Sequence, residues 1–363
     1  MSEHIQTRIA NHIGFLILDR PKALNSLSLQ MVRALTETLL AWRDDDGVRA
    51  VVIHSTSERA FCAGGDIRFF YEAGTKTPQG GSALLEDFFT EEYALNHLIH
   101  HYPKPYIAVM DGIVMGGGMG IAQAGPDNRL RIVTDRTKMA MPEVNIGLFP
   151  DVGGSFFLSR TAGLIGTYLG VTGEVIGAAD ALYAGLADVY VPAPELPALL
   201  DFLASCSDAD PRTAVRTFAE PFAAQADPAN SMLAAQRALI DRHFAHDTVA
   251  AITASLAQDT GPFAQKTLAA MNKRSPLMMC VTLEQLRRGA SMSIAECLRM
   301  ERTMVRRSFE HGEVLEGVRA VVIDKDNAPK WNPPSLADIS GDTVAYFFAP
   351  AWPAHAHPLR DLG

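Results

Sequence analysis

The stretch PYIAVMDGIVMGGGMG, residues 105–120, joins a continuous apolar run to a run of glycines. The apolar run is typical of a buried strand, and the glycines at 116–118 let the chain turn sharply into a helix. Five glycines and Asp111 interrupt the stretch, so it does not read as a transmembrane segment. A strand followed directly by a helix is the unit from which α/β proteins are built.

Similar units precede and follow this stretch. Residues 5–19 read as a hairpin with alternating apolar positions, and Ser28 can cap an amphipathic helix. Continuous apolar runs at 50–54 and 129–133 predict further buried strands. This alternation predicts an α/β core over residues 1–192.

The second half of the chain has a different composition. It is Ala-rich with few strand-like runs, and prolines divide it into successive segments that are typical of helices. We therefore predict a mainly helical C-terminal region over residues 193–363.

The overall composition limits the classes of function that the protein can have. The chain has 363 residues, with 48% hydrophobic and 20% charged residues, which indicates a soluble globular protein. Its net charge of −9 disfavours nucleic acid and anionic membranes as partners. Its four cysteines form no C-x-x-C pair, and no signal or transit peptide is visible, so we predict a reduced, cytoplasmic protein without a metal site.

Two carboxylates stand in the apolar, turn-rich segment MPEVNIGLFPDVGGSFF, residues 141–157. Burying an ionised carboxylate costs several kcal/mol unless it is paired, so Glu143 and Asp151 are candidates for chemistry. Each also has a structural interpretation. Glu143 follows a proline and could be a first-turn helix acid, and Asp151 could cap a helix.

Two glycine-rich segments, FCAGGDI (61–67) and GIVMGGGMG (112–120), each lie between a predicted strand and a helix. Glycine allows the backbone to approach a ligand, and a helix N-terminus presents N–H groups without partners. Two such segments can supply two donors to one oxygen, which is an oxyanion hole. Tight packing and turns are the alternative.

Sequence motifs of other enzyme and nucleotide-binding classes have little support in this chain. No segment fits G-x-G-x-x-G, the P-loop, the nucleophile elbow or H-E-x-x-H. His97 and His101 are spaced i,i+4 on a predicted helix, but no third ligand is spaced to join them, so a solvated helix face is the better interpretation. Cys62 lies beside a glycine segment, yet no base is nearby in the sequence.

The order of four motifs resembles the enoyl-CoA hydratase/isomerase (crotonase) superfamily. These motifs are RPKALN (20–25), AGGDI (63–67), GGG (116–118) and MPE (141–143). Within the superfamily the chain is similar to the 3-hydroxyisobutyryl-CoA hydrolase branch, through FCAGGDIR (61–68), EEY (91–93), IGLFPDVGG (146–154) and EGVRAVVIDKDNAPKW (316–331). The resemblance covers residues 5–335 and implies a spiral of β-β-α units with a helical C-terminal region.

The resemblance also implies residue roles. The amides of Gly65 and Gly117 would form the oxyanion hole, and Glu143 would attack the thioester or activate water. Asp151 would orient a 3-hydroxyl or assist proton transfer, and Glu92 would lie near the acyl group. CoA would run along four further residues, which are Ala23, Ala63, Asp66 and Ile67.

One departure from the hydratases favours hydrolysis. They carry a second catalytic glutamate two residues after the glycine triplet, where this chain has Gly120. Adding water to a double bond uses two carboxylates, so its loss disfavours hydration. We therefore expect hydrolysis, and the resemblance to this branch implies that the substrate is 3-hydroxyisobutyryl-CoA, in valine catabolism.

Two alternatives stay open, an enoyl-CoA hydratase or isomerase that uses Glu143 alone, and a non-catalytic CoA-binding protein. The resemblance implies no cofactor beyond the CoA of the substrate. It also favours homo-oligomers, either trimers or dimers of trimers.

Overall fold

The structure is a computed structural model that describes every residue except 1, 207 and 209. Packing groups the chain into two compact units. Unit 1 comprises residues 1–65, 95–140 and 176–235, and unit 2 comprises residues 66–94, 141–175 and 236–363. The domain boundary predicted at residue 192 is not a boundary between these units. The two predicted domains, residues 1–192 and 193–363, stay a prediction.

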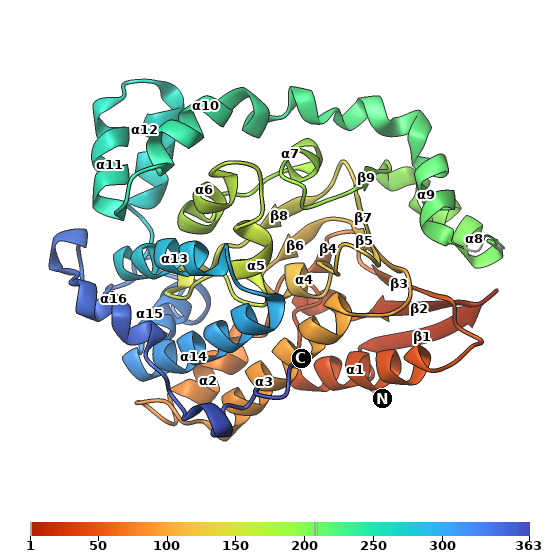
Figure 1. Ribbon diagram of the computed structural model, residues 1–363, viewed down its shortest axis with the longest axis horizontal. Helices are drawn as coiled ribbons and strands as arrows, with labels where there is room; N and C mark the ends of the chain where they lie inside the picture. The colour runs from red at the N-terminus through yellow and green to blue at the C-terminus, as the bar shows by residue number, and fades with distance from the viewer. Residues whose placement is uncertain (1, 207, 209) are drawn as a thin grey trace. The chain divides into compact units, whose positions relative to one another are not determined.

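Unit 1 contains two sheets (Figure 1). The larger has the order β1-β2-β3-β5-β7-β9 and is parallel except for the β1–β2 hairpin, and the smaller is parallel with the order β4-β6-β8. The strands are β1 Ile5–Ala10, β2 Ile13–Leu18, β3 Ala50–Ser55, β4 Ala60–Cys62, β5 Tyr106–Met110, β6 Ile113–Met115, β7 Arg129–Val133, β8 Lys138–Ala140 and β9 Val189–Tyr190.

Successive strand pairs divide between the two sheets. The pairs β3/β4, β5/β6 and β7/β8 each place their first strand in the larger sheet and their second in the smaller one. Each pair is thus one turn of a spiral of β-β-α units. The predicted α/β fold, its hairpin and its buried strands are confirmed.

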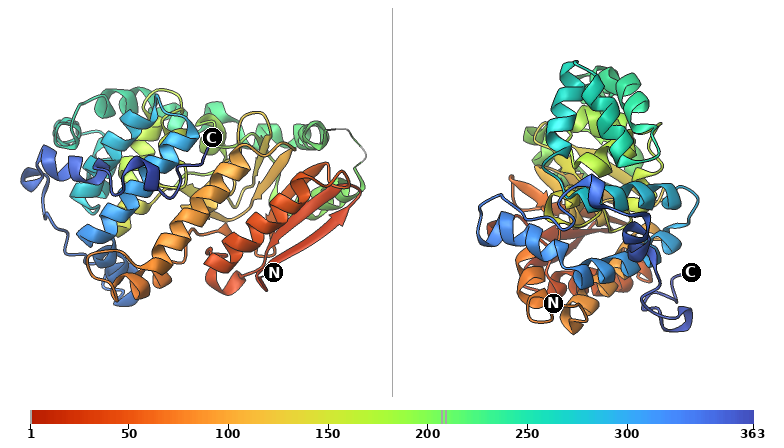
Figure 2. Two further views of the ribbon diagram at one scale, coloured as in Figure 1. Left: turned by 60° about the horizontal axis from the view of Figure 1, so that its bottom comes forward. Right: turned by 90° about the vertical axis from the view of Figure 1, so that its left-hand side faces the viewer.

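The helices follow the signals read from the sequence. Ser28 caps α1 by accepting a hydrogen bond from the Met31 amide, and α1 lies along the β1–β2 hairpin (Figure 2). Prolines at the first position start α9, α12 and α13, where the missing N–H costs nothing. The α-helices are α1 Leu29–Arg43, α2 Ile67–Gly74, α3 Ala83–His100, α4 Gly117–Gly120, α5 Gly154–Leu158, α6 Ile165–Thr172, α7 Ala178–Tyr183, α8 Leu196–Ser205, α9 Pro211–Ala219, α10 Met232–Phe244, α11 Val249–Gln258, α12 Pro262–Met271, α13 Pro276–Gly289, α14 Ile294–His311, α15 Glu313–Val318 and α16 Gly341–Phe348.

After β9, every element in the described residues is a helix. Helices α8 and α9 nevertheless belong to the core of unit 1, where Leu199 and Val215 pack with sheet residues such as Phe15, Ile107 and Leu130. None of the described helices combines the length and the apolar character that crossing a bilayer requires.

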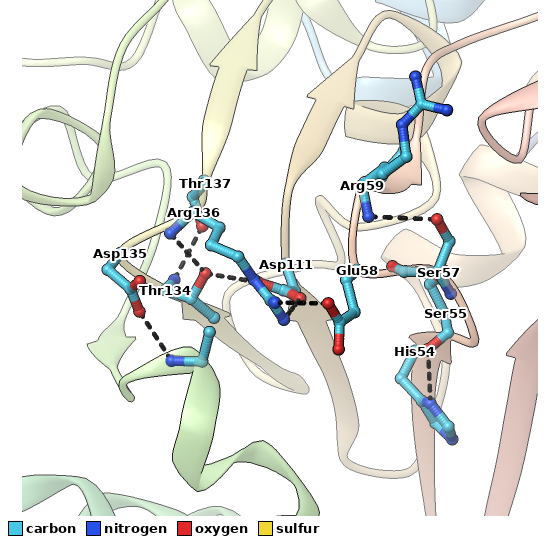
Figure 3. A network of polar contacts seen from close by, with 12 residues as sticks. His54, Ser55, Ser57, Glu58, Arg59, Asp111, Thr134, Asp135, Arg136 and Thr137 are labelled. Carbon is cyan, nitrogen blue, oxygen red and sulfur yellow. Dashed lines mark hydrogen bonds and ion pairs between the residues drawn. The ribbon is translucent and has the colours of Figure 1, made fainter.

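Asp111, the acid in the apolar stretch, has a structural role. Its carboxylate accepts hydrogen bonds from Thr134 Oγ1 at 2.7 Å and from Arg136 Nε at 3.0 Å (Figure 3). Arg136 also forms an ion pair with Glu58 at 3.2 Å. This network joins the end of β5 to the turn after β7, and it anchors the chain where it passes into the glycine-rich segment.

Gly118 is required by the close approach of α4 to β4. A Cβ at this position would lie 2.3 Å from the carbonyl oxygen of Cys62, which is backbone and cannot swing away. We expect Gly118→Ala to lower the free energy of unfolding by about 1–3 kcal/mol, measured by urea denaturation. Gly177→Ala is the matched control, because nothing lies within 4 Å of a Cβ there. Equal stability of the two variants would contradict this expectation.

Candidate active site

The two glycine-rich segments lie close together within unit 1. A Cβ placed on Gly64 would lie 3.6 Å from the amide nitrogen of Gly117 and 3.3 Å from the carbonyl oxygen of Met115. Gly117 is the first residue of α4, so its N–H has no acceptor within the helix. Gly65 forms a bridge with Leu27, in which the Leu27 amide donates to Gly64 O at 2.8 Å. The structure therefore brings the segments of Gly65 and Gly117 together.

The loop that contains Ala23 is hydrogen-bonded to the first glycine-rich segment, residues 61–67. The Ala63 amide donates to Leu24 O at 3.0 Å, and Leu24 is held at a φ of 51°. The buried side chain of Asn25 fixes this loop, because its Nδ2 donates to Ser55 Oγ at 2.7 Å and to two carbonyls of β4. Ala23 and Ala63 thus belong to one hydrogen-bonded loop system.

The other two predicted CoA-contact residues begin a helix. Asp66 is the N-cap of α2, and its side chain accepts from the Phe69 amide at 3.3 Å. Ile67 is the first residue of the helix. The Asp66 side chain therefore has a structural role, and the predicted CoA contacts of both residues stay predictions.

Four carboxyl groups of unit 2 gather in what we call the acid cluster. Its members are Glu92 on α3, Glu143 at the start of the short helix η2 (Glu143–Ile146), Asp151 before α5, and Glu301 on α14. Their exposed fractions are 2%, 6%, 5% and 0%. Tyr93 donates its hydroxyl hydrogen to Asp151 Oδ2 at 2.7 Å. Within the described residues, Glu92 Oε1 and Glu143 Oε2 are buried oxygens without a hydrogen-bond partner.

This geometry resolves the two structural interpretations. Glu143 is indeed a first-turn residue of a short helix, yet it is buried, and its Oε2 has no hydrogen-bond partner among the described residues. Asp151 does not cap α5 with its side chain, because the N-cap residue is Gly153 and the Gly154 amide donates to the backbone carbonyl of Asp151 at 2.7 Å. Neither side chain caps a helix, so both carboxylates stay candidates for chemistry.

Burial sets the proton affinity of the cluster. Burial is the largest cause that raises the pKa of Glu143 and of Glu92 well above the usual value, and the charge of Asp151 adds to it. Burial also raises the pKa of Asp151 to about 6, although the hydrogen bond from Tyr93 acts in the opposite direction. A raised pKa is characteristic of a carboxyl group that exchanges protons near neutral pH.

The cluster should make the protein less stable in mild base. Burial raises the pKa of Glu301 from 4.5 to about 8, so the folded state binds more protons than the unfolded state between these values. The free energy of unfolding must then fall as pH rises through that window. Buried histidines act in the opposite direction, but only near their unfolded pKa of 6.5 and below. We expect urea midpoints to fall from about pH 7 to about pH 8.5, and less so in Glu301→Gln; a midpoint that rises would contradict this.

Sequence reasoning missed two members of this site, Tyr93 and Glu301. Tyr93 lies within the EEY motif, but the motif does not reveal its hydrogen bond to Asp151. Glu301 lies three or four residues from Cys297, Leu298, Met304 and Val305, all of which are buried. This helical periodicity places an acid on an apolar helix face, a signal that could have identified it.

The fold and these residues can be compared with known proteins. The family model described as enoyl-CoA hydratase/isomerase matches residues 13–348. The chain belongs to the enoyl-CoA hydratase/isomerase family. The predicted superfamily and its fold are thereby confirmed.

Three relatives within this family differ in their names. The chain is 39% identical to a mitochondrial 3-hydroxyisobutyryl-CoA hydrolase of Gallus gallus, over 93% of this chain and 86% of the relative. It is 38% identical to the small ribosomal subunit protein mS47 of Neurospora crassa, over 89% of this chain and 66% of that protein. A crystal structure of a carnitinyl-CoA dehydratase from Mycobacterium thermoresistibile is 39% identical, with a TM-score of 0.87 over 97% of this chain and 98% of that one.

The 3-hydroxyisobutyryl-CoA hydrolase branch is also confirmed, since that hydrolase matches over most of both chains. One prediction is corrected by the same comparison. The expected cytoplasmic location is wrong, because the named hydrolases of this branch are mitochondrial. That expectation rested on the spacing of the cysteines and on the lack of a visible targeting signal, and neither observation identifies a compartment.

Proposed function

We propose that this protein hydrolyses 3-hydroxyisobutyryl-CoA to 3-hydroxyisobutyrate and CoA. The observation that carries the proposal is Glu143, a buried carboxylate with an oxygen that has no hydrogen-bond partner, beside a second acid, Asp151. Burying unpartnered carboxylates costs stability, and such a cost is typical of a site built for chemistry. The similarity to a 3-hydroxyisobutyryl-CoA hydrolase supports the acyl group.

In the proposed reaction, the thioester oxygen accepts hydrogen bonds from the amides of Gly65 and Gly117. The ionised carboxylate of Glu143 then attacks the carbonyl carbon, or takes a proton from the water that does so. The C–O bond forms, negative charge moves to the carbonyl oxygen, and collapse breaks the C–S bond to release the CoA thiolate. After direct attack the acyl group is held on Glu143 as an anhydride, which water hydrolyses to release 3-hydroxyisobutyrate and restore the carboxylate. After attack by water the acid is released directly, and in both routes the thiolate takes up the proton that water gives. Asp151 orients the 3-hydroxyl or assists proton transfer, and Glu92 lines the acyl site. CoA is held by Ala23, Ala63, Asp66 and Ile67.

Hydration of an enoyl-CoA is the second candidate, and the name of the Mycobacterium thermoresistibile structure favours it. That chemistry uses two carboxylates, one of which follows the glycine triplet in hydratases of the family. In this chain the position is Gly120, the last residue of α4, which is buried and has no side chain. We therefore place hydration second.

A role without catalysis is the third candidate, because the Neurospora crassa relative is named as a ribosomal protein. This chain retains Gly65, Gly117, Glu143 and Asp151. A protein without chemistry would gain nothing from burying two acids at a cost to stability. The acids therefore favour an enzyme.

A small substrate panel tests these alternatives. We expect thiol release from 3-hydroxyisobutyryl-CoA that is faster than from isobutyryl-CoA, its matched analogue without the 3-hydroxyl. Incubation with crotonyl-CoA should cause no loss of enoyl absorbance. Loss of enoyl absorbance without thiol release would establish the second candidate, and CoA binding without turnover of any substrate would establish the third.

A further inference from the structure

Glu301 is a buried acid that the proposed reaction does not use. It lies on α14 and is 0% exposed, yet both of its oxygens are occupied. Oε2 accepts from the Gly153 amide at 2.8 Å, and Oε1 accepts from the Ser155 amide at 2.9 Å. The Glu301 side chain therefore binds two backbone amides of the turn that follows Asp151. This turn leads into α5, which is labelled with α14 in Figure 1.

That turn has a strained backbone. Val152 has a φ of 52° and Gly153 a φ of 91°. A β-branched residue in the left-handed region is a genuine outlier, because its branched side chain crowds the backbone there. Such a conformation persists only when its surroundings fix it, and it clusters at functional sites.

A second side chain holds the same turn from α13. Gln285 Nε2 donates to Pro150 O at 2.5 Å and to Ser155 Oγ at 2.8 Å. Asp151 thus lies between Pro150, which Gln285 holds, and Gly153, which Glu301 holds. The backbone on both sides of Asp151 is held, and the hydrogen bond from Tyr93 then directs its carboxylate.

The surroundings of Glu301 add an electrostatic effect. The titratable groups that interact with it are Asp151, Glu143, Tyr93 and, on α14 itself, Cys297. The neighbouring arginines have other partners. Arg302 donates to Thr90 and Glu86 of α3, and Arg160 donates to backbone carbonyls, including Gly289 O at 3.1 Å. Burial raises the pKa of Glu301 to about 8, so its carboxyl group is mainly protonated at neutral pH, and its charge acts on Glu143 only as the pH rises toward that value.

We propose that Glu301 is a positioning residue for the hydrolase, which clamps the strained turn after Asp151 and thereby holds Asp151 beside Tyr93 and Glu143. This inference rests on the proposed function and adds a residue to it. Two properties of Glu301 matter, the length that reaches both amides and the two acceptor oxygens that bind them.

Two variants separate these properties. Glu301→Asp keeps both acceptor oxygens but is one methylene shorter, so it cannot reach both amides. We expect kcat to fall about 10-fold or more with KM nearly unchanged, and the acid limb of the pH profile to stay in place. Glu301→Gln keeps the length but has one acceptor oxygen in place of two, so it can bind only one of the two amides. We expect a similar fall in kcat, again with KM nearly unchanged. Glu310→Gln, further along α14, is the control, since its carboxylate pairs with Arg306 and Arg307.

Hydrogen exchange tests the clamp without any substrate. The amides of Gly153 and Ser155 should be protected in the wild-type protein and should exchange faster in both Glu301 variants, but not in Glu310→Gln. Fast exchange in the wild type would overturn the proposal. So would faster exchange in the variants with kcat within about twofold of wild type, since the clamp would then be structural only. If the wild type hydrolyses no thioester, the proposed function fails, and the exchange data still decide whether Glu301 clamps the turn.

Discussion

Glu143→Gln is expected to lower thiol release from 3-hydroxyisobutyryl-CoA by about 10³-fold or more. Both proposed routes, direct attack and activation of water, need a carboxylate oxygen with electrons to donate, and an amide cannot replace it at neutral pH. Since Glu143 must be ionised to act and its pKa is raised by burial, activity of the wild type should rise with pH above the usual range of a glutamate. Rates across a pH series measure both effects.

The fold should survive this change. Gln has nearly the same shape, and removing a buried carboxyl group removes its desolvation cost, so the urea midpoint at about pH 8 should be equal to or above that of the wild type. Glu310→Gln serves as the matched control and should keep full activity. The partners of Glu310 are Arg306, Arg307 and Tyr346, which are not members of the acid cluster. Undiminished thiol release by a folded Glu143→Gln protein would rule out the catalytic role.

Asp151→Asn is expected to have the second largest effect, about 10²-fold on 3-hydroxyisobutyryl-CoA and clearly less on isobutyryl-CoA. The carboxylate of Asp151 can accept a hydrogen bond from a 3-hydroxyl, and its pKa of about 6 leaves it ionised at neutral pH. An analogue without the hydroxyl gains nothing from that acceptor. The ratio of kcat/KM for the two thioesters measures the difference.

Tyr93→Phe is the companion variant for this test. It removes the hydroxyl that donates to Asp151 at 2.7 Å and that helps to hold the pKa of Asp151 down. The pKa of Asp151 should therefore rise, and the preference for the 3-hydroxyl substrate should weaken toward lower pH. Equal losses on both thioesters in Asp151→Asn would remove the hydroxyl-orienting role.

Local signals in the sequence specified local structure. Ser28 has an oxygen that can accept from a backbone amide three residues on, so it caps α1 wherever that helix packs. Continuous apolar runs became the strands β3, β5 and β7, because such runs are stable only when both faces are buried. The glycine runs left two interpretations open, and at Gly118 the structure shows tight packing, since a Cβ there would overlap Cys62 O.

The site itself was only partly predictable. Glu143 and Asp151 stood out because acids are rare in apolar segments, and the structure places both in the acid cluster. Glu301 lies 150 residues beyond Asp151 in the sequence, and its partners are two backbone amides, which leave no mark on residue identity. The grouping of α8 and α9 with the sheet was equally hidden, since an amphipathic helix does not specify which apolar surface it covers.

The sequence by itself determined the family, the β-β-α repeat and the pair of acids, because these depend on residue type, short spacing and the order of motifs. Only the tertiary structure decided which groups surround those acids and how tightly each holds its proton. The physical reason is that desolvation and charge interactions depend on distances in space. The acids that interact here come from α3, η2, the turn before α5, and α14, which are widely separated in the sequence.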